Sequence, residues 1–151
     1  MSTTTAEIND SAIIRDLWQL LKPKIMLLVV VTAIAAMLIS PVYNLAHPIQ
    51  LVLTILAIAL GSGGASAFNM WYDRDIDKIM SRTKQRPIPS GRINSDEALA
   101  FSLISISASI ILMFIASNTK ATWMLLFSIF YYTVIYTILL KRHTVQNIVI
   151  G

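Results

Sequence analysis

The chain has 151 residues, of which 56% are hydrophobic and only 13% carry a formal charge. Soluble domains contain about a quarter charged residues, so this composition excludes an ordinary soluble domain and favours a membrane protein. The sequence has a net charge of +4 and no cysteine, which excludes disulfides and thiolate metal sites.

The first 23 residues are polar and mixed, and they form the first of two predicted units. Apolar residues recur with helical spacing from Ala12 to Leu21, and Ser11 is suited to cap such a helix. We predict an amphipathic helix that lies on the membrane surface before Pro23. The second unit, residues 24–151, is predicted to be a membrane domain.

Three uncharged runs in the second unit predict four membrane-spanning helices. Such a helix needs roughly 20 mainly apolar residues. The first run, from Ile25 to Tyr72, is long enough for two helices and is divided near Pro41 and Pro48. The predicted spans are residues 25–43, 48–72, 98–118 and 121–140. The predicted fold class is therefore all-α, a polytopic transmembrane helix bundle.

Basic residues gather on one side of these predicted spans. The segment before the first span, the loop between the second and third, and the residues after the fourth together contain eleven Lys and Arg residues. The other two loops contain only Lys120. By the positive-inside rule, the N-terminus and the loop of residues 73–97 face the cytoplasm, or a matrix in an organelle. Topology explains the net charge, so no nucleic-acid partner is expected.

An acidic motif lies at the end of the second predicted span, where Asn69, Asp73 and Asp77 recur every four residues. If the helix continues through them, their side chains share one face. Charged groups at a membrane edge are costly, and oxygen ligands are those that Mg²⁺ prefers, so a metal site is expected. Asp75 falls outside the repeat and is interpreted as a solvated or paired carboxylate.

Basic residues are interleaved with these acids and mostly follow them in the same loop. Acids can hold Mg²⁺ while Arg and Lys hold phosphate oxygens, so the composition fits a metal-bridged diphosphate. The alternative is an ordinary charged loop with simple salt bridges. The regular spacing of the acidic motif favours the metal site over that alternative.

A run of small residues, Gly61-Ser-Gly-Gly-Ala-Ser-Ala67, precedes the acidic motif by one to two turns. It is not a phosphate-binding loop, because no Gly-Lys-Ser/Thr follows it and it lies inside a predicted span. We predict that it allows close packing against a neighbouring helix.

A family resemblance is carried by the acidic motif and by three segments, of which the second overlaps the motif: Leu21–Lys24, Asp73–Arg92 with its Arg-Thr-Lys-x-Arg-Pro sequence, and Leu140–Gly151. Together they resemble the UbiA superfamily of intramembrane prenyltransferases. Within it, the chain is most similar to the protoheme IX farnesyltransferases, also called heme O synthases. The resemblance runs from about Leu17 to the last residue.

The resemblance implies a bundle of about nine spans around a central cavity, with two acidic motifs that bind Mg²⁺ and an isoprenoid diphosphate. The first motif matches Asn69, Asp73 and Asp77 position by position. No second acidic cluster follows Glu97 in this sequence. We therefore expect the N-terminal half of a longer enzyme, inactive on its own.

The resemblance also implies the chemistry, a transfer of the farnesyl group of farnesyl diphosphate to a vinyl group of protoheme IX. The product is heme O for heme-copper terminal oxidases, and a downstream heme-modifying enzyme is an expected partner. The implied setting is the lipid bilayer of a bacterial inner membrane. Asn69, Asp73 and Asp77 are the expected Mg²⁺ ligands. The candidates for diphosphate binding are Arg82, Lys84, Arg86, Lys24, Lys141 and Arg142.

Two alternatives remain open on the sequence. One is a UbiA-type aromatic prenyltransferase of quinone biosynthesis, which shares the acidic motif. The other is a non-enzymatic four-helix membrane protein whose charged loop binds a partner or lipid headgroups.

Overall fold

The computed structural model describes residues 3–41 and 47–141, and every regular element within these ranges is a helix. The all-α prediction is therefore confirmed. The elements are α1 (Thr3–Leu20), α2 (Pro23–Ile39), α3 (Pro48–Tyr72), α4 (Arg74–Ile79), α5 (Ser95–Ala116), α6 (Thr119–Phe130) and the π-helix η2 (Tyr131–Leu140).

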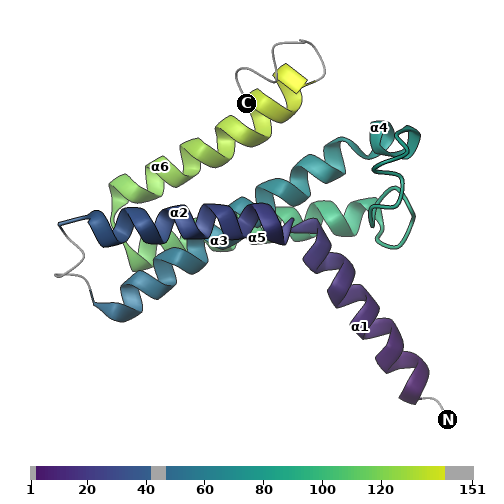
Figure 1. Ribbon diagram of the computed structural model, residues 1–151, viewed down its shortest axis with the longest axis horizontal. Helices are drawn as coiled ribbons and strands as arrows, with labels where there is room; N and C mark the ends of the chain where they lie inside the picture. The colour runs from purple at the N-terminus through teal and green to yellow at the C-terminus, as the bar shows by residue number, and fades with distance from the viewer. Residues whose placement is uncertain (1–2, 42–46, 142–151) are drawn as a thin grey trace.

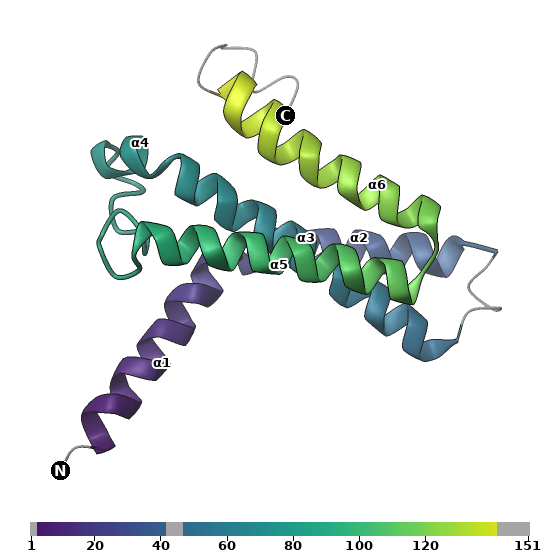
Figure 2. The same cartoon turned by 180° about the vertical axis from the view of Figure 1, so that it is seen from behind.

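The helices of the bundle alternate in direction along the sequence (Figures 1 and 2). They are α2, α3, α5 and the continuous helix that α6 forms with η2. This alternation brings the start of α2, the end of α3, the start of α5 and the end of η2 to one end of the bundle (Figure 1). The basic segments of the sequence meet at that end.

The helices have the length and composition of membrane spans, and the chain is an integral membrane protein. Three qualify individually among the described residues: Pro48–Tyr72, Ser95–Ala116 and Thr119–Leu140. A fourth span arises if Ser11–Leu20 and Pro23–Ile39, which meet at a bend of 57°, count as one broken helix. Large apolar side chains such as Leu103, Ile104 and Ile111 are exposed, as a lipid environment requires.

Helix α1 differs from its prediction at its start. It begins at Thr3 rather than after Ser11, so Ser11 lies inside the helix and the predicted N-cap is wrong. No Gly or Pro interrupts residues 3–10, and nothing in their sequence prevents the helix from extending back. Ile14 and Trp18 are exposed on α1. Its predicted place on the membrane surface stays a prediction.

Close packing of α3 against α5 confirms the prediction for the small-residue run. A Cβ atom on Gly61 would lie 2.7 Å from Ser109 Oγ, and one on Gly64 would lie 3.0 Å from Ser105 Cβ. Ser109 Oγ donates to the carbonyl of Ala57 at 2.6 Å. Because a glycine allows this approach where another residue would clash, the packing fixes the direction in which the end of α3 points.

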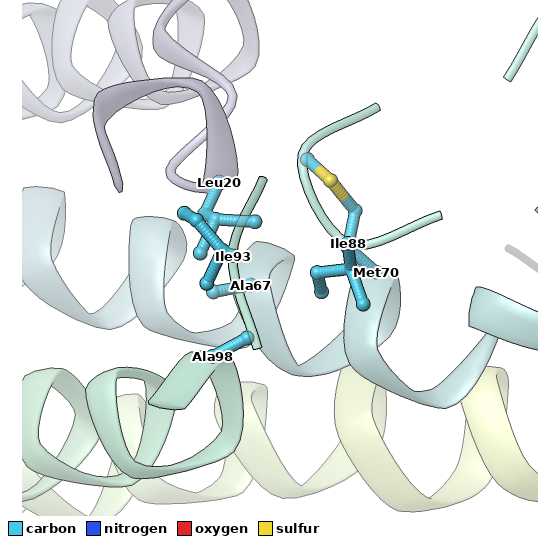
Figure 3. Close-up of a cluster of buried hydrophobic side chains, with 6 residues drawn as sticks. All are labelled: Leu20, Ala67, Met70, Ile88, Ile93 and Ala98. Atoms are coloured by element: carbon cyan, nitrogen blue, oxygen red, sulfur yellow. The ribbon is translucent and has the colours of Figure 1, made fainter. Parts of the chain in front are cut away.

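The loop between α4 and α5 is folded back on the bundle by a buried apolar cluster (Figure 3). Two loop residues, Ile88 and Ile93, contact side chains of three helices. The helix residues in the cluster are Leu20 of α1, Ala67 and Met70 of α3 and Ala98 of α5. Arg92 adds an ion pair, in which Nε donates to both carboxylate oxygens of Asp16 at 3.1 Å. The loop is thereby held against α1 and α3.

Candidate functional site

The acidic motif keeps its four-residue register although α3 ends within it. The amide of Asp73 donates to the carbonyl of Asn69 at 3.0 Å, and the amide of Asp77 donates to that of Asp73 at 2.8 Å. Asp73 itself, with φ −86° and ψ 2°, joins α3 to α4. Asn69, Asp73 and Asp77 are 2%, 3% and 4% exposed. Three oxygen-bearing side chains are therefore buried together at the end of α3.

Each of these three side chains accepts a hydrogen bond from a basic residue, and the three basic residues come from different parts of the chain. The pairs are Lys22 Nζ to Asn69 Oδ1 at 3.1 Å, Lys141 Nζ to Asp73 Oδ2, and Arg86 Nη1 to Asp77 Oδ2 at 2.6 Å. Charge-assisted hydrogen bonds of this kind are the strong ones in proteins. Lys141 and Arg86, both predicted from the sequence, thus meet the acidic motif.

Lys22 is a member of the site that the sequence analysis missed in favour of Lys24. Its backbone is left-handed (φ 49°, ψ 67°) just before Pro23, and this places its side chain against α3. Lys24, in the first turn of α2, is exposed. Burial lowers the pKa of Lys22 to about 8, with contributions from the positive charges of Arg86 and Lys141.

The other predicted diphosphate ligands are not joined to the acidic motif by any hydrogen bond between described residues. Arg82 and Lys84 are exposed on the loop, and no ion pair joins either of them to another described residue. Arg142 lies outside the described residues. Roles for Arg82, Lys84, Lys24 and Arg142 in diphosphate binding stay predictions.

Thr137 of η2 also touches the motif, and nothing in the sequence pattern singled it out. Its side chain is fully buried, and Oγ1 accepts a hydrogen bond from Asn69 Nδ2 at 3.2 Å. Asn69 is therefore held from two sides, by Lys22 through its oxygen and by Thr137 through its nitrogen.

The donor atoms fit a divalent metal shared with a diphosphate. Asp73 Oδ1 is buried and has no hydrogen-bond partner in the part of the chain that the structure describes. Buried carboxylate oxygens are normally satisfied, and a cation would satisfy this one. Residues 11–41 and 47–141 contain no group of three His, Cys, Asp or Glu side chains arranged for a metal. Two carboxylates and an amide suit Mg²⁺, which keeps water and takes phosphate oxygens as its remaining ligands.

An apolar cavity of about 530 Å³ opens beside the site between α2, α3, α6 and η2. Its lining follows α3 from Thr54 to Ser66, roughly 18 Å of helix. Ser66 is three residues from Asn69 in the sequence. Tyr132 of η2 also lines the cavity, and its backbone carbonyl accepts a hydrogen bond from Thr137 Oγ1. The lining on α3 thus ends at Ser66, about one helical turn before Asn69, and the acidic residues themselves do not line the cavity.

Comparison with known proteins gives a consistent family match. Residues 28–151 match the model of the UbiA prenyltransferase family. A protoheme IX farnesyltransferase of Hyphomonas neptunium is 54% identical over 138 residues, which cover 90% of this chain and 43% of the relative. Its counterpart in Granulibacter bethesdensis is 48% identical over 147 residues, or 97% and 46% of the two chains.

A third relative extends the match over the whole sequence. The protoheme IX farnesyltransferase of Agrobacterium fabrum is 47% identical over 151 residues, which are 100% of this chain and 47% of the relative. The chain thus spans less than half the length of these relatives. No solved structure matches it.

Proposed function

Because the chain belongs to the UbiA prenyltransferase family, we propose that it carries a diphosphate site of a protoheme IX farnesyltransferase. The reaction breaks the C1–O bond of farnesyl diphosphate, and the diphosphate leaves with the electron pair. A vinyl carbon of protoheme IX forms the new bond to C1. Water then adds to the resulting cation and loses a proton, which leaves a hydroxyethylfarnesyl group.

The observation that carries this proposal is the paired cluster at the end of α3. Two carboxylates and an amide oxygen face three basic side chains, and Asp73 Oδ1 has no partner among the described residues. Such a cluster is built to take up positive and negative ligands together. A metal–diphosphate complex contains both a cation and an anion.

Asn69, Asp73 and Asp77 would hold Mg²⁺ through their oxygens. Bound Mg²⁺ would stabilise the negative charge that develops on the leaving diphosphate. The basic partners Lys22, Arg86 and Lys141 lie beside these oxygens, within reach of the same ligand. If Mg²⁺ took up these three oxygens, the N–H groups of the three basic residues would be available to donate to phosphate oxygens.

The farnesyl chain would occupy the apolar cavity. Its lining of side chains such as Ile25, Ile58 and Met124 matches a hydrocarbon, and on α3 it reaches Ser66, three residues before Asn69. An apolar lining would disfavour water beside the carbon on which positive charge develops. The positive-inside rule places the end of the bundle that carries the basic residues on the cytoplasmic side, so the site would face the cytoplasm from a bacterial inner membrane.

The test is a chimera in which this chain replaces the matching segment of the Hyphomonas neptunium relative. With Mg²⁺ and farnesyl diphosphate, we expect transfer to protoheme IX and none to 4-hydroxybenzoate, measured by chromatography of the products. Transfer to 4-hydroxybenzoate alone would favour the aromatic prenyltransferase. If the chimera inserts correctly into the membrane but transfers farnesyl to neither acceptor, the result would contradict the proposal and favour a non-enzymatic role.

A further inference from the structure

Two consecutive hydrogen bonds, through the hydroxyl group of Thr137, connect the side chain of Asn69 on α3 to the backbone of η2. Asn69 Nδ2 of α3 donates to Thr137 Oγ1 at 3.2 Å, and Thr137 Oγ1 donates to the carbonyl of Tyr132 at 2.8 Å. Asn69 is 2% exposed and Thr137 is 0% exposed, so water does not compete for these bonds.

The direction of these two hydrogen bonds is fixed because the Thr137 hydroxyl group has only one proton. A hydroxyl group has one proton, and Thr137 gives it to a carbonyl that can only accept. Toward Asn69 the hydroxyl can therefore only accept, so the amide must present its NH₂ group. The amide oxygen then points the other way, toward the ammonium of Lys22, which can only donate.

We propose that Thr137 is a positioning residue that turns the oxygen of the Asn69 amide, rather than its nitrogen, into the metal site. The proposal rests on the proposed function, in which that oxygen is a ligand. Hard divalent cations take oxygen ligands and reject an amide NH₂, so a flipped amide would remove one ligand. Partners that orient metal ligands typically change metal affinity by about 10- to 100-fold when they are removed.

Thr137 and Thr133 both lie in the π-helix η2, but their hydroxyl groups bond different carbonyls. Thr137 reaches the carbonyl five residues earlier, whereas Thr133 on the same continuous helix reaches that of Ile129, four residues earlier. Thr133 is also buried, and no hydrogen bond joins it to Asn69. Thr133 is thus a matched control for a buried threonine hydroxyl that lacks the link to the motif.

The first test measures Mn²⁺ binding in the presence of inorganic pyrophosphate by electron paramagnetic resonance, with the full chain in detergent micelles. Thr137→Val, which keeps the shape and loses the hydroxyl, is expected to weaken Mn²⁺ binding about 10-fold or more. Thr137→Ser and Thr133→Val are expected to bind as the unaltered chain does. Equal affinity of Thr137→Val and the unaltered chain would overturn the proposal.

A double-mutant cycle separates positioning from a general loss of structure. A carboxylate presents an oxygen in either orientation, so Asn69→Asp needs no hydroxyl to turn it. In the Asn69→Asp background, Thr137→Val is therefore expected to leave Mn²⁺ affinity unchanged. If Thr137→Val weakens Mn²⁺ binding equally with Asn and with Asp at position 69, Thr137 has a structural role and the proposal is overturned.

A spectroscopic readout keeps the inference separate from the proposed function. The protein is labelled with ¹⁵N-asparagine, and the side-chain NH₂ signals of Asn69 are identified in the NMR spectrum by their absence in Asn69→Asp. These signals are expected to shift in Thr137→Val but not in Thr133→Val. Unshifted signals would overturn the positioning role. If the signals shift but neither the unaltered chain nor the chimera described above binds Mn²⁺ with pyrophosphate, the proposed function fails and the ligand role of Asn69 fails with it.

Discussion

The ammonium group of Lys141 is hydrogen-bonded to Oδ2 of Asp73, which lies 68 residues earlier in the chain. This contact joins the last turn of the bundle to the end of α3. It leaves the other oxygen of Asp73 buried and without a partner among the described residues. With Lys22 on Asn69 and Arg86 on Asp77, it surrounds the acidic motif with positive charge.

The role of Lys141 can be tested by removing its charge. Lys141→Gln is expected to weaken the binding of farnesyl diphosphate about 10- to 100-fold, because hydrogen bonds to charged groups contribute about 1.5–3 kcal/mol. Isothermal titration calorimetry with Mg²⁺ present measures this affinity. Lys120→Gln removes the same charge from the opposite end of the bundle and is expected to have no effect. Similar losses in both variants would indicate a general electrostatic effect.

Packing of α3 against α5 makes Gly61 intolerant of a side chain. Gly61→Ala is expected to destabilise the bundle by about 1–3 kcal/mol, because its Cβ atom would lie 2.7 Å from Ser109 Oγ. The midpoint of thermal unfolding in detergent reports this loss. Ser109→Ala removes the clashing atom, so the double variant is expected to be less destabilised than the sum of the two single variants. Additive losses would show that this contact is not the cause.

The ion pair between Arg92 and Asp16 holds the loop that carries Arg86. Arg92→Ala would leave Asp16, whose side chain is 5% exposed, as a buried carboxylate without this partner. Faster amide hydrogen exchange across residues 80–94 is the expected result. The exchanged pair Asp16→Arg with Arg92→Asp is expected to restore part of the protection. Exchange that stays unchanged in Arg92→Ala would show that the apolar cluster alone holds the loop.

The cavity can be filled without touching the acidic motif. Ser62 lines the cavity on α3, so Ser62→Phe is expected to weaken farnesyl diphosphate binding severalfold and to leave pyrophosphate binding unchanged. Competition between the two ligands measures both affinities. Ser107→Phe adds the same ring to an exposed position on α5 and serves as the control. Unchanged farnesyl diphosphate binding in Ser62→Phe would place the hydrocarbon chain elsewhere, and equal weakening of both ligands would show a general distortion of the site.

Much of this arrangement could be predicted because it depends on local sequence patterns. Uncharged runs predicted the helices, and the four-residue repeat predicted that Asn69, Asp73 and Asp77 share a face. Small residues predicted the tight approach of α3 and α5. Each of these features depends on periodicity or size, which a single sequence shows directly.

The partners of the motif depend on geometry that local patterns do not show. A left-handed residue before Pro23 brings Lys22 rather than Lys24 to Asn69. A π-helix places Thr137 against the same amide, and no hydrophobic period distinguishes such a stretch from an α-helix. The fold of the loop follows from Ile88, Ile93 and Arg92, whose contacts lie on three different helices.

The most direct test of the metal–diphosphate site is Asp73→Asn in the chimera described above, assayed for Mg²⁺-dependent farnesyl transfer to protoheme IX. This change keeps the size of the side chain and replaces one carboxylate oxygen with an NH₂ group. Asp75→Asn alters an exposed carboxylate outside the repeat and is the control. We predict that transfer is lost in Asp73→Asn and kept in Asp75→Asn. Full transfer by the Asp73→Asn chimera would contradict the assignment of Asp73 to the metal.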